Sequence, residues 1–343
     1  MPAKTTLHHR VVPLIAALAV VFPAVGRAEI IKFEDMRRGT TVTEVECGSR
    51  PNTVWVSAYG RNVCMRYYFS DAGGGGPEAT IFINGDKPGV VPNKIVKPEV
   101  EKDTDTDAMD RAARKISRLM GQPGIYLARM GLDGSSGHHA QRHTNLELQI
   151  TNEAIEAIKR HHGFARLNIY GQSGGASLIG GLVAMRNDLN CAVPGSGRLV
   201  ASQSSITRNN SVADPALAII NPYDGVAEIA RNSTAKIWLV TDPDDSVVMR
   251  KYQDPFVWGL RDAGRQVDQF YVSAADPQHH GVVKYAAAAV RECIRGSTRE
   301  QVAEVLANVA QKIAEARSQN QPQSTTESAA RPPGPVTEPT AAQ

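Results

Sequence analysis

A serine within the pattern Gly-x-Ser-x-Gly is the residue of this chain best suited to nucleophilic chemistry. Ser173 lies in Gly171–Gly175, between the apolar run Leu167–Tyr170 and a run with helical character, Ala176–Met185. In that context the serine occupies a sharp turn between a strand and a helix, which exposes its hydroxyl to substrate. Glycines are needed because the turn is strained and a neighbouring Cβ would collide with the crossing strand and helix. We therefore take Ser173 as the candidate nucleophile, which requires a base to accept its proton.

The candidate base follows a later strand. Val267–Val272 alternates like a strand and leads to Asp276–Gly281, which contains two adjacent histidines. A histidine suits general-base catalysis because its pKa lies near neutral pH. We favour His280, which directly precedes Gly281 and a helical run, and His279 remains the alternative. Successive residues of an extended loop point to opposite sides, so only one of the two rings is expected to face Ser173.

The candidate acid follows another predicted strand, Lys236–Thr241, which is rich in β-branched and aromatic residues. A carboxylate there can orient the histidine and stabilise its protonated form. We favour Asp245, and Asp242 remains the main alternative. The nearby Asp244 is also close enough to compete, so two of the three carboxylates are expected to shape the turn or cap a helix.

An oxyanion hole requires two backbone N–H groups directed at the charge that develops on the substrate oxygen. The first is expected from Gly174, the residue after the nucleophile. The second is expected from Asp86, with Gly85 as the alternative, in Asn84-Gly85-Asp86 at the end of the predicted central strand Ala79–Ile83. A carboxylate beside an oxyanion would repel it, so the Asp86 side chain must point away.

The order serine, acid, histidine, each after a strand, resembles the α/β-hydrolase family over roughly residues 76–297. The resemblance implies a mostly parallel central sheet with helices on both faces, N-terminal antiparallel strands and a small cap formed by residues 197–234. In the family, the position of Asn84 often carries a histidine followed by glycine, so the oxyanion donor at this loop stays open. The domain division that follows is 1–28 signal peptide, 29–75 β-rich lead-in, 76–297 hydrolase domain, 298–317 C-terminal helix and 318–343 disordered tail.

The resemblance implies a serine hydrolase that cleaves an ester through an acyl-enzyme, with a small-molecule ester or short acyl compound as substrate. The Gly-x-Ser-x-Gly-Gly form is also similar to the catalytic domains of prolyl-oligopeptidase-type peptidases, although no propeller domain precedes it here. A peptidase is therefore one alternative, and a non-catalytic binding protein with the same fold is another. A redox protein is disfavoured because the chain has no Cys-x-x-Cys.

The N-terminus has the pattern of a secretory signal peptide. Lys4 and Arg10 form a basic region, Val11–Phe22 is apolar, and Gly26-Arg27-Ala28 offers small residues for cleavage. The apolar run is too short for a transmembrane helix, although an uncleaved anchor is the alternative. We expect export to the periplasm or medium, a mature chain that begins near Glu29, and no stable membrane insertion.

Because an exported chain folds in an oxidising compartment, where disulfides persist, we expect its four cysteines to form disulfides. We favour the pairs Cys47–Cys64 and Cys191–Cys293, although four cysteines allow three connectivities and sequence alone cannot choose among them. The alternative is buried free thiols.

Remaining features support a globular enzyme. The net charge of +3 and interspersed charges exclude an evident nucleic-acid surface, and we expect no cofactor and no metal. His138, His139 and His143 lie in a polar loop, 131–144, but adjacent histidines on a loop rarely bind one ion, so we expect them to be solvated. The sequence makes no prediction of oligomeric state. The other elements expected are strands at 124–129 and 191–193, helices at 105–120, 145–162 and 302–314, and short antiparallel strands within 31–70.

Overall fold

The computed structural model describes residues 29–90 and 101–320. The expected signal peptide lies outside these residues, as does the tail from residue 321 onward. Within the described chain no helix is both long enough and apolar enough to cross a bilayer.

One large sheet organises the described residues. It has eight strands in the order β10-β9-β8-β7-β4-β6-β3-β2, and a separate short pair joins β1 to β5. Six neighbouring strands run parallel, namely β10, β9, β8, β7, β4 and β6. Strand β3 pairs antiparallel with both β6 and β2. This confirms the predicted mostly parallel sheet with antiparallel N-terminal strands. The strands are β1 Ile30–Ile31, β2 Thr53–Ala58, β3 Arg61–Ser70, β4 Glu78–Ile83, β5 Thr104–Asp105, β6 Gly124–Leu127, β7 Arg166–Gln172, β8 Leu189–Gly195, β9 Lys236–Thr241 and β10 Val267–Tyr271.

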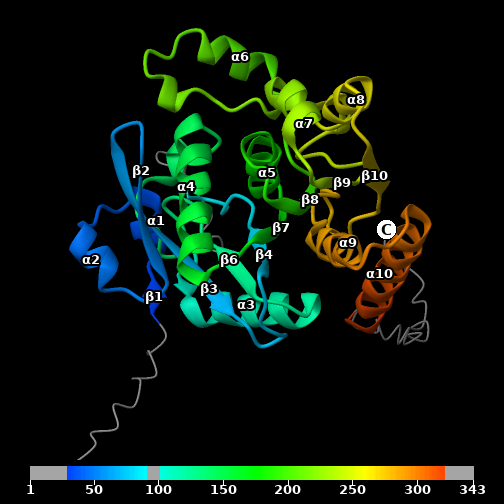
Figure 1. The fold of residues 1–343 in the computed structure, drawn as a ribbon, viewed down its shortest axis with the longest axis horizontal. Coiled ribbons are helices and arrows are strands. Elements are labelled where there is room, and N and C mark those ends of the chain that lie inside the picture. Colours follow the sequence, from blue (N-terminus) through cyan, green and yellow to red (C-terminus); the bar gives the residue numbers. More distant parts are fainter. Residues whose placement is uncertain (1–28, 91–100, 321–343) are drawn as a thin grey trace, which may run out of the picture.

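Helices cover both faces of this sheet (Figure 1). The helices are α1 Phe33–Arg38, α2 Glu44–Gly48, α3 Thr106–Met120, α4 Asn145–His162, α5 Gly174–Met185, α6 Gln203–Asn209, α7 Val226–Asn232, α8 Asp254–Asp262, α9 Val283–Arg295 and α10 Arg299–Asn320. One apolar core joins the sheet to α4, α5, α7 and α8, and a second joins its other face to α3, α9 and α10.

Strand β9 shows why the sheet needs both layers. Ile237 and Leu239 belong to the first core, whereas Trp238 and Val240 belong to the second. Because successive side chains of a strand point to opposite faces, an uninterrupted apolar run requires cover on both sides. The same pattern in β4 and β7 places these two strands at the centre of the sheet. Their carboxyl ends therefore lie side by side, and the loops that follow them meet there.

The N-terminal segment differs from the expectation of short strands throughout residues 31–70. Residues 33–38 and 44–48 form the short helices α1 and α2, and only β2 and β3 form the expected antiparallel pair. Thr43 and Glu46 make a capping box, in which each side chain accepts a hydrogen bond from the other residue's backbone N–H. This motif starts a helix and outweighs the strand preference of Thr and Val nearby.

The segment expected to form a small cap, 197–234, contains the short helices α6 and α7. Figure 1 shows α6 standing out from the sheet beyond α4 and α5. A hydrogen bond of 2.8 Å from the Ile220 N–H to the His143 carbonyl oxygen ties this segment to the loop before α4. The cap segment is thus joined to the carboxyl end of the sheet.

Both favoured disulfides are present. Cys47 is bonded to Cys64, which links α2 to β3, and Cys191 is bonded to Cys293, which links β8 to α9. The last helix, α10, is longer than predicted and continues to residue 320, three residues into the segment expected to be disordered.

Candidate active site

Ser173 occupies the turn between β7 and α5, in the strained geometry that the sequence predicts. Its φ of 54° is unusual for a residue with a side chain. A Cβ on Gly171 would lie 2.5 Å from the carbonyl oxygen of Ile83, and one on Gly175 would overlap the same oxygen. The two glycines are therefore required because β4 passes against the turn, and the turn holds Ser173 at the edge of the sheet.

His280 and Asp245 meet although they follow different strands. His280 Nδ1 lies 2.9 Å from Asp245 Oδ2. The other carboxylate oxygen of Asp245 accepts hydrogen bonds of 2.8 Å from the N–H groups of Val247 and Val248. These backbone donors fix the carboxylate, which in turn fixes the imidazole ring.

The loop that carries His280 is shaped by Asp276. Its carboxylate accepts hydrogen bonds from the N–H groups of Gln278, His280 and Gly281. These contacts hold the pKa of Asp276 below its usual range, although partial burial alone would raise it.

Among the described residues, one side-chain hydrogen bond connects this loop to the serine turn. Gln172 Nε2 donates a hydrogen bond of 3.1 Å to the carbonyl oxygen of His280. Within the described residues, Ser173 Oγ itself makes no hydrogen bond, so His280 and Ser173 are neighbours through Gln172 rather than through a direct bond.

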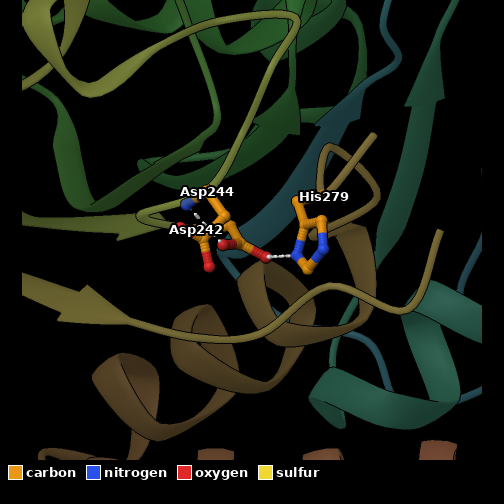
Figure 2. A group of neighbouring side chains, drawn as sticks. All are labelled: Asp242, Asp244 and His279. Carbon is orange, nitrogen blue, oxygen red and sulfur yellow. Dashed lines mark hydrogen bonds and ion pairs between the residues drawn. The ribbon is translucent and has the colours of Figure 1, made fainter. Parts of the chain in front are cut away.

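The alternative pair, Asp242 and His279, also forms, and Figure 2 shows it beside Asp244. His279 Nδ1 lies 3.1 Å from Asp242 Oδ2. One ligand atom from each of these three residues lies within 4.8 Å of the others, which is the spacing of a possible metal site. Asp242, however, already accepts hydrogen bonds from the N–H groups of Asp244 (2.9 Å) and Ala274 (2.5 Å). The carboxylate that a metal would need is thus already engaged by protein donors.

Asp86 and Gly174, the two residues expected to supply the oxyanion donors, lie close to Ser173. A Cβ built on Gly85 would lie 3.1 Å from Ser173 Cβ and 3.7 Å from Ser173 Oγ, so the residue before Asp86 touches the serine. Gly174 follows the serine directly. In the part of the chain that the structure describes, the N–H groups of Asp86 and Gly174 donate to no acceptor.

The Asp86 side chain is held by three donors. Its carboxylate lies 2.6 Å from Arg129 Nη1, 3.0 Å from Arg142 Nε and 2.8 Å from His143 Nε2. Burial alone would raise the pKa of this carboxyl. The hydrogen bond from His143 and the charge of Arg129 together hold the pKa well below its usual range, so Asp86 is ionised.

Arg129 is itself held by a fully buried carboxylate. Its Nε and Nη2 donate to the two oxygens of Glu147 at 2.9 and 3.0 Å, and neither side chain is exposed by more than 1%. Burial would raise the pKa of Glu147, but the Arg129 charge and hydrogen bonds lower it below its usual range.

The histidine loop 131–144 is packed rather than solvated, contrary to expectation. His139 is fully buried and His138 and His143 are half-buried. Ser135 and Ser136 accept hydrogen bonds from backbone N–H groups of β3. The loop is polar because it supplies partners to backbone groups, which is a role that composition does not reveal.

Arg129, Glu147, Gln172 and Asp276 are residues of this region that sequence reasoning missed. Arg129 carried one usable signal, because a charged residue that follows a buried parallel strand lies at the edge where functional loops meet. Glu147 and Gln172 carried none, since a glutamate in the first turn of a helix is ordinary.

Comparison with known proteins gives a structural result only. No family model matches the chain, and no curated protein matches it by sequence. An esterase of Pyrococcus furiosus is 12% identical over 75% of this chain and 94% of its own, with a TM-score of 0.50. A second crystal form of it gives 12% identity, 76% and 97% coverage and the same TM-score.

A puromycin-hydrolyzing peptidase of Mycobacterium tuberculosis is 15% identical over 75% of this chain and 41% of its own, with a TM-score of 0.49. At these identities only the fold can be compared. The strand order, the helices on both faces and the likeness to the Pyrococcus esterase agree on one architecture. The chain therefore has the α/β-hydrolase fold.

Proposed function

We propose that this chain is an exported serine hydrolase that cleaves a carboxylic ester through Ser173, His280 and Asp245. The observation that carries the proposal is the pairing of His280 with Asp245 at 2.9 Å on a loop bonded to Gln172, next to a serine with φ of 54°. An imidazole held by a carboxylate beside an exposed hydroxyl is the arrangement that activates a serine.

The protonation states follow from the hydrogen bonds. A carboxylate only accepts, so the Nδ1 of His280 carries the proton in its bond with Asp245. The Nε2 lone pair is then free to accept the Ser173 proton. The missing direct bond between the two residues is compatible with this role, because such contacts are commonly loose until substrate binds.

The reaction has two halves. Ser173 Oγ attacks the carbonyl carbon while His280 takes its proton, and the carbonyl electrons move to the oxygen. The tetrahedral intermediate expels the alcohol, which receives that proton, and leaves an acyl-enzyme. Water then repeats the sequence on the acyl-enzyme, releasing the carboxylic acid and restoring Ser173.

Two free backbone donors support stabilisation of the oxyanion. The N–H groups of Gly174 and Asp86 have no acceptor among the described residues, and Gly85, which precedes Asp86, lies against Ser173. Removal of one such donor typically costs about 3 kcal/mol of transition-state stabilisation. The Asp86 carboxylate is bonded to other groups, as the proposal requires.

Export is supported by the signal-peptide pattern before Glu29 and by two disulfides, which persist in oxidising compartments. The protein recovered from the periplasm or medium should begin near residue 29 and titrate no free thiol when denatured without reductant. Four free thiols would contradict the export proposal.

A fluorophosphonate probe tests the catalytic proposal. The folded chain should be labelled once, and mass spectrometry of its peptides should place the label on Ser173. Ser173→Ala should take no label. A label elsewhere, or none on the folded protein, would sink the proposal. A series of p-nitrophenyl esters of graded acyl length then reports the substrate class.

A further inference from the structure

A group of charged side chains surrounds the loop that offers the Asp86 N–H. We call it the Asp86 cluster: Asp86, Arg129, Arg142, His143 and Glu147. It links the loop after β4, the loop after β6 and the first turn of α4. These segments are far apart in sequence and meet at the carboxyl edge of the sheet, where Ser173 lies.

The cluster also reaches the first residue of α5. A Cβ on Gly174 would overlap both Asp86 Oδ1 and Arg129 Nη1. At Gly174 the added atom would meet the ends of two charged side chains, whereas at Gly171 and Gly175 it would meet the backbone of β4. The Asp86 carboxylate thus lies against one expected oxyanion donor while its own backbone offers the other.

The charges are arranged in order of burial. Arg129 and Glu147 are inaccessible to solvent, Arg142 and His143 are about one quarter exposed, and Asp86 is one third exposed. A buried ion pair is expensive to desolvate and is weak evidence for a contribution to stability. Its position directly beneath Asp86 calls for another explanation.

A negative charge at this position is unfavourable for the proposed reaction if considered alone. The substrate oxygen becomes negative next to Ser173, and a nearby carboxylate repels it. The two arginines balance the charges of Asp86 and Glu147 together, so charge neutralisation alone does not explain a carboxylate at position 86. What the carboxylate does uniquely is accept from three donors at once and thereby fix its own backbone.

We propose that the Asp86 carboxylate is a positioning group, and that Arg129 is the residue that anchors it. Held in this way, the Asp86 N–H stays directed at the carbonyl oxygen of a substrate bound at Ser173. The inference rests on the proposed function, and it assigns a role to residues that take no part in proton transfer. Arg142 and His143, which are partly exposed to solvent, also bond to the Asp86 carboxylate.

The substitution Asp86→Asn tests this because position and charge predict opposite signs. It keeps the backbone N–H and the side-chain size, but it removes the charge and one acceptor oxygen. If the carboxylate acts only by its charge, its removal relieves repulsion and kcat rises. If it positions the N–H, kcat falls about 10-fold or more, up to the roughly 10²- to 10³-fold loss seen when an oxyanion donor is removed.

The readouts separate positioning from loss of structure. KM for a p-nitrophenyl ester should stay within about 2-fold, and affinity for a matched trifluoromethyl ketone should fall by the same factor as kcat/KM. That inhibitor forms a tetrahedral adduct on the serine, whose oxygen needs the N–H. The matched control is Asp188→Asn. Asp188 is also held by two cations, Arg186 and Lys159, but it lies before β8 at the opposite edge of the sheet. The Asp188→Asn substitution should leave kcat and inhibitor affinity unchanged.

Each outcome is decisive. An Asp86→Asn protein that labels at Ser173 but keeps or raises kcat and inhibitor affinity overturns the positioning role and leaves the proposed function intact. A wild-type protein that takes no label at Ser173 removes both. If Asp86→Asn does not fold, Arg142→Gln decides, since this side chain is partly exposed. It should lower kcat and inhibitor affinity together several-fold, and no change in either overturns the inference.

Discussion

Two Asp–His pairs lie next to each other at the end of the sheet, and they differ in surroundings rather than in chemistry. Asp245 and His280 are 2.9 Å apart, and Asp242 and His279 are 3.1 Å apart. Both aspartates are buried, but the His280 side chain is 16% exposed and the His279 side chain is 39% exposed. His279 also adopts a positive φ of 56°.

The difference teaches that a pairing distance alone does not identify a catalytic histidine. The His280 segment is bonded through Gln172 to the serine turn, whereas Asp242 and Asp244 line a cavity of about 620 Å³ that also contacts α10. Asp242 accepts the Ala274 N–H and so holds the chain that follows β10. We infer that the Asp245–His280 pair takes part in the reaction. The Asp242–His279 pair stabilises the loop that carries His280.

Replacing the two histidines in turn gives the largest contrast. His280→Ala should abolish labelling of Ser173 by a fluorophosphonate and lower kcat on the order of 10⁴-fold or more, because no base remains for the serine proton. His279→Ala should retain most of the labelling rate. Time courses of labelling on the two folded variants measure this. Loss of labelling in His279→Ala alone would transfer the base to His279.

The aspartates should show the same contrast at a smaller amplitude. Asp245→Asn should keep the fold and lower kcat by about 10⁴-fold, a loss known for the corresponding change in a serine protease, because the imidazole loses its orientation and counter-charge. Asp242→Asn should have a much smaller effect on kcat. Steady-state kinetics with circular dichroism as the folding control would test the pair, and a reversed ranking would show that the two roles are exchanged.

A third histidine sharpens the comparison because it has no partner at hydrogen-bond distance. Both ring nitrogens of the buried His139 lack one within the described residues. Burial, reinforced by the Arg129 charge, lowers the pKa of His139 to about 3. The unfolded chain binds a proton near pH 6.5 that the folded chain does not, so stability is complete above that pH and is lost on acidification.

The expected decrease in the free energy of unfolding from this one group is about 2 kcal/mol between pH 6.5 and pH 5. Urea unfolding at several pH values should show the slope in the wild type and a shallower slope in His139→Phe, which cannot bind the proton. An equal slope in both proteins would show that His139 does not contribute to it.

Much of the fold was predictable because its signals are local. Helix α4 and strand β9 have the predicted bounds. The glycines around Ser173 predict a tight turn, and β4 packs so closely against this turn that a Cβ at Gly171 or Gly175 would overlap it. A continuous apolar run or a strained turn is encoded within a few residues. The pairs Cys47–Cys64 and Cys191–Cys293 also agree with expectation.

The rest depends on residues that meet only in the folded chain. Asp86, Arg129 and Glu147 are each unremarkable in sequence, and their bonds span 18 to 43 residues. The polar loop with three histidines was misread as solvated, because its partners are backbone groups of β3. Whether Ser173 and His280 act together stays a prediction for the labelling experiments.

The bond between Cys191 and Cys293 closes a loop of the chain with a sequence separation of 102 residues. Asp245 and His280 lie inside this loop and Ser173 lies outside it. A proteolytic cut in the outlying helix α6, inside the loop, would therefore release no fragment. The nicked chain would remain one covalent molecule, with acid and base still tethered to the part that carries the nucleophile, until a reductant opened the bond.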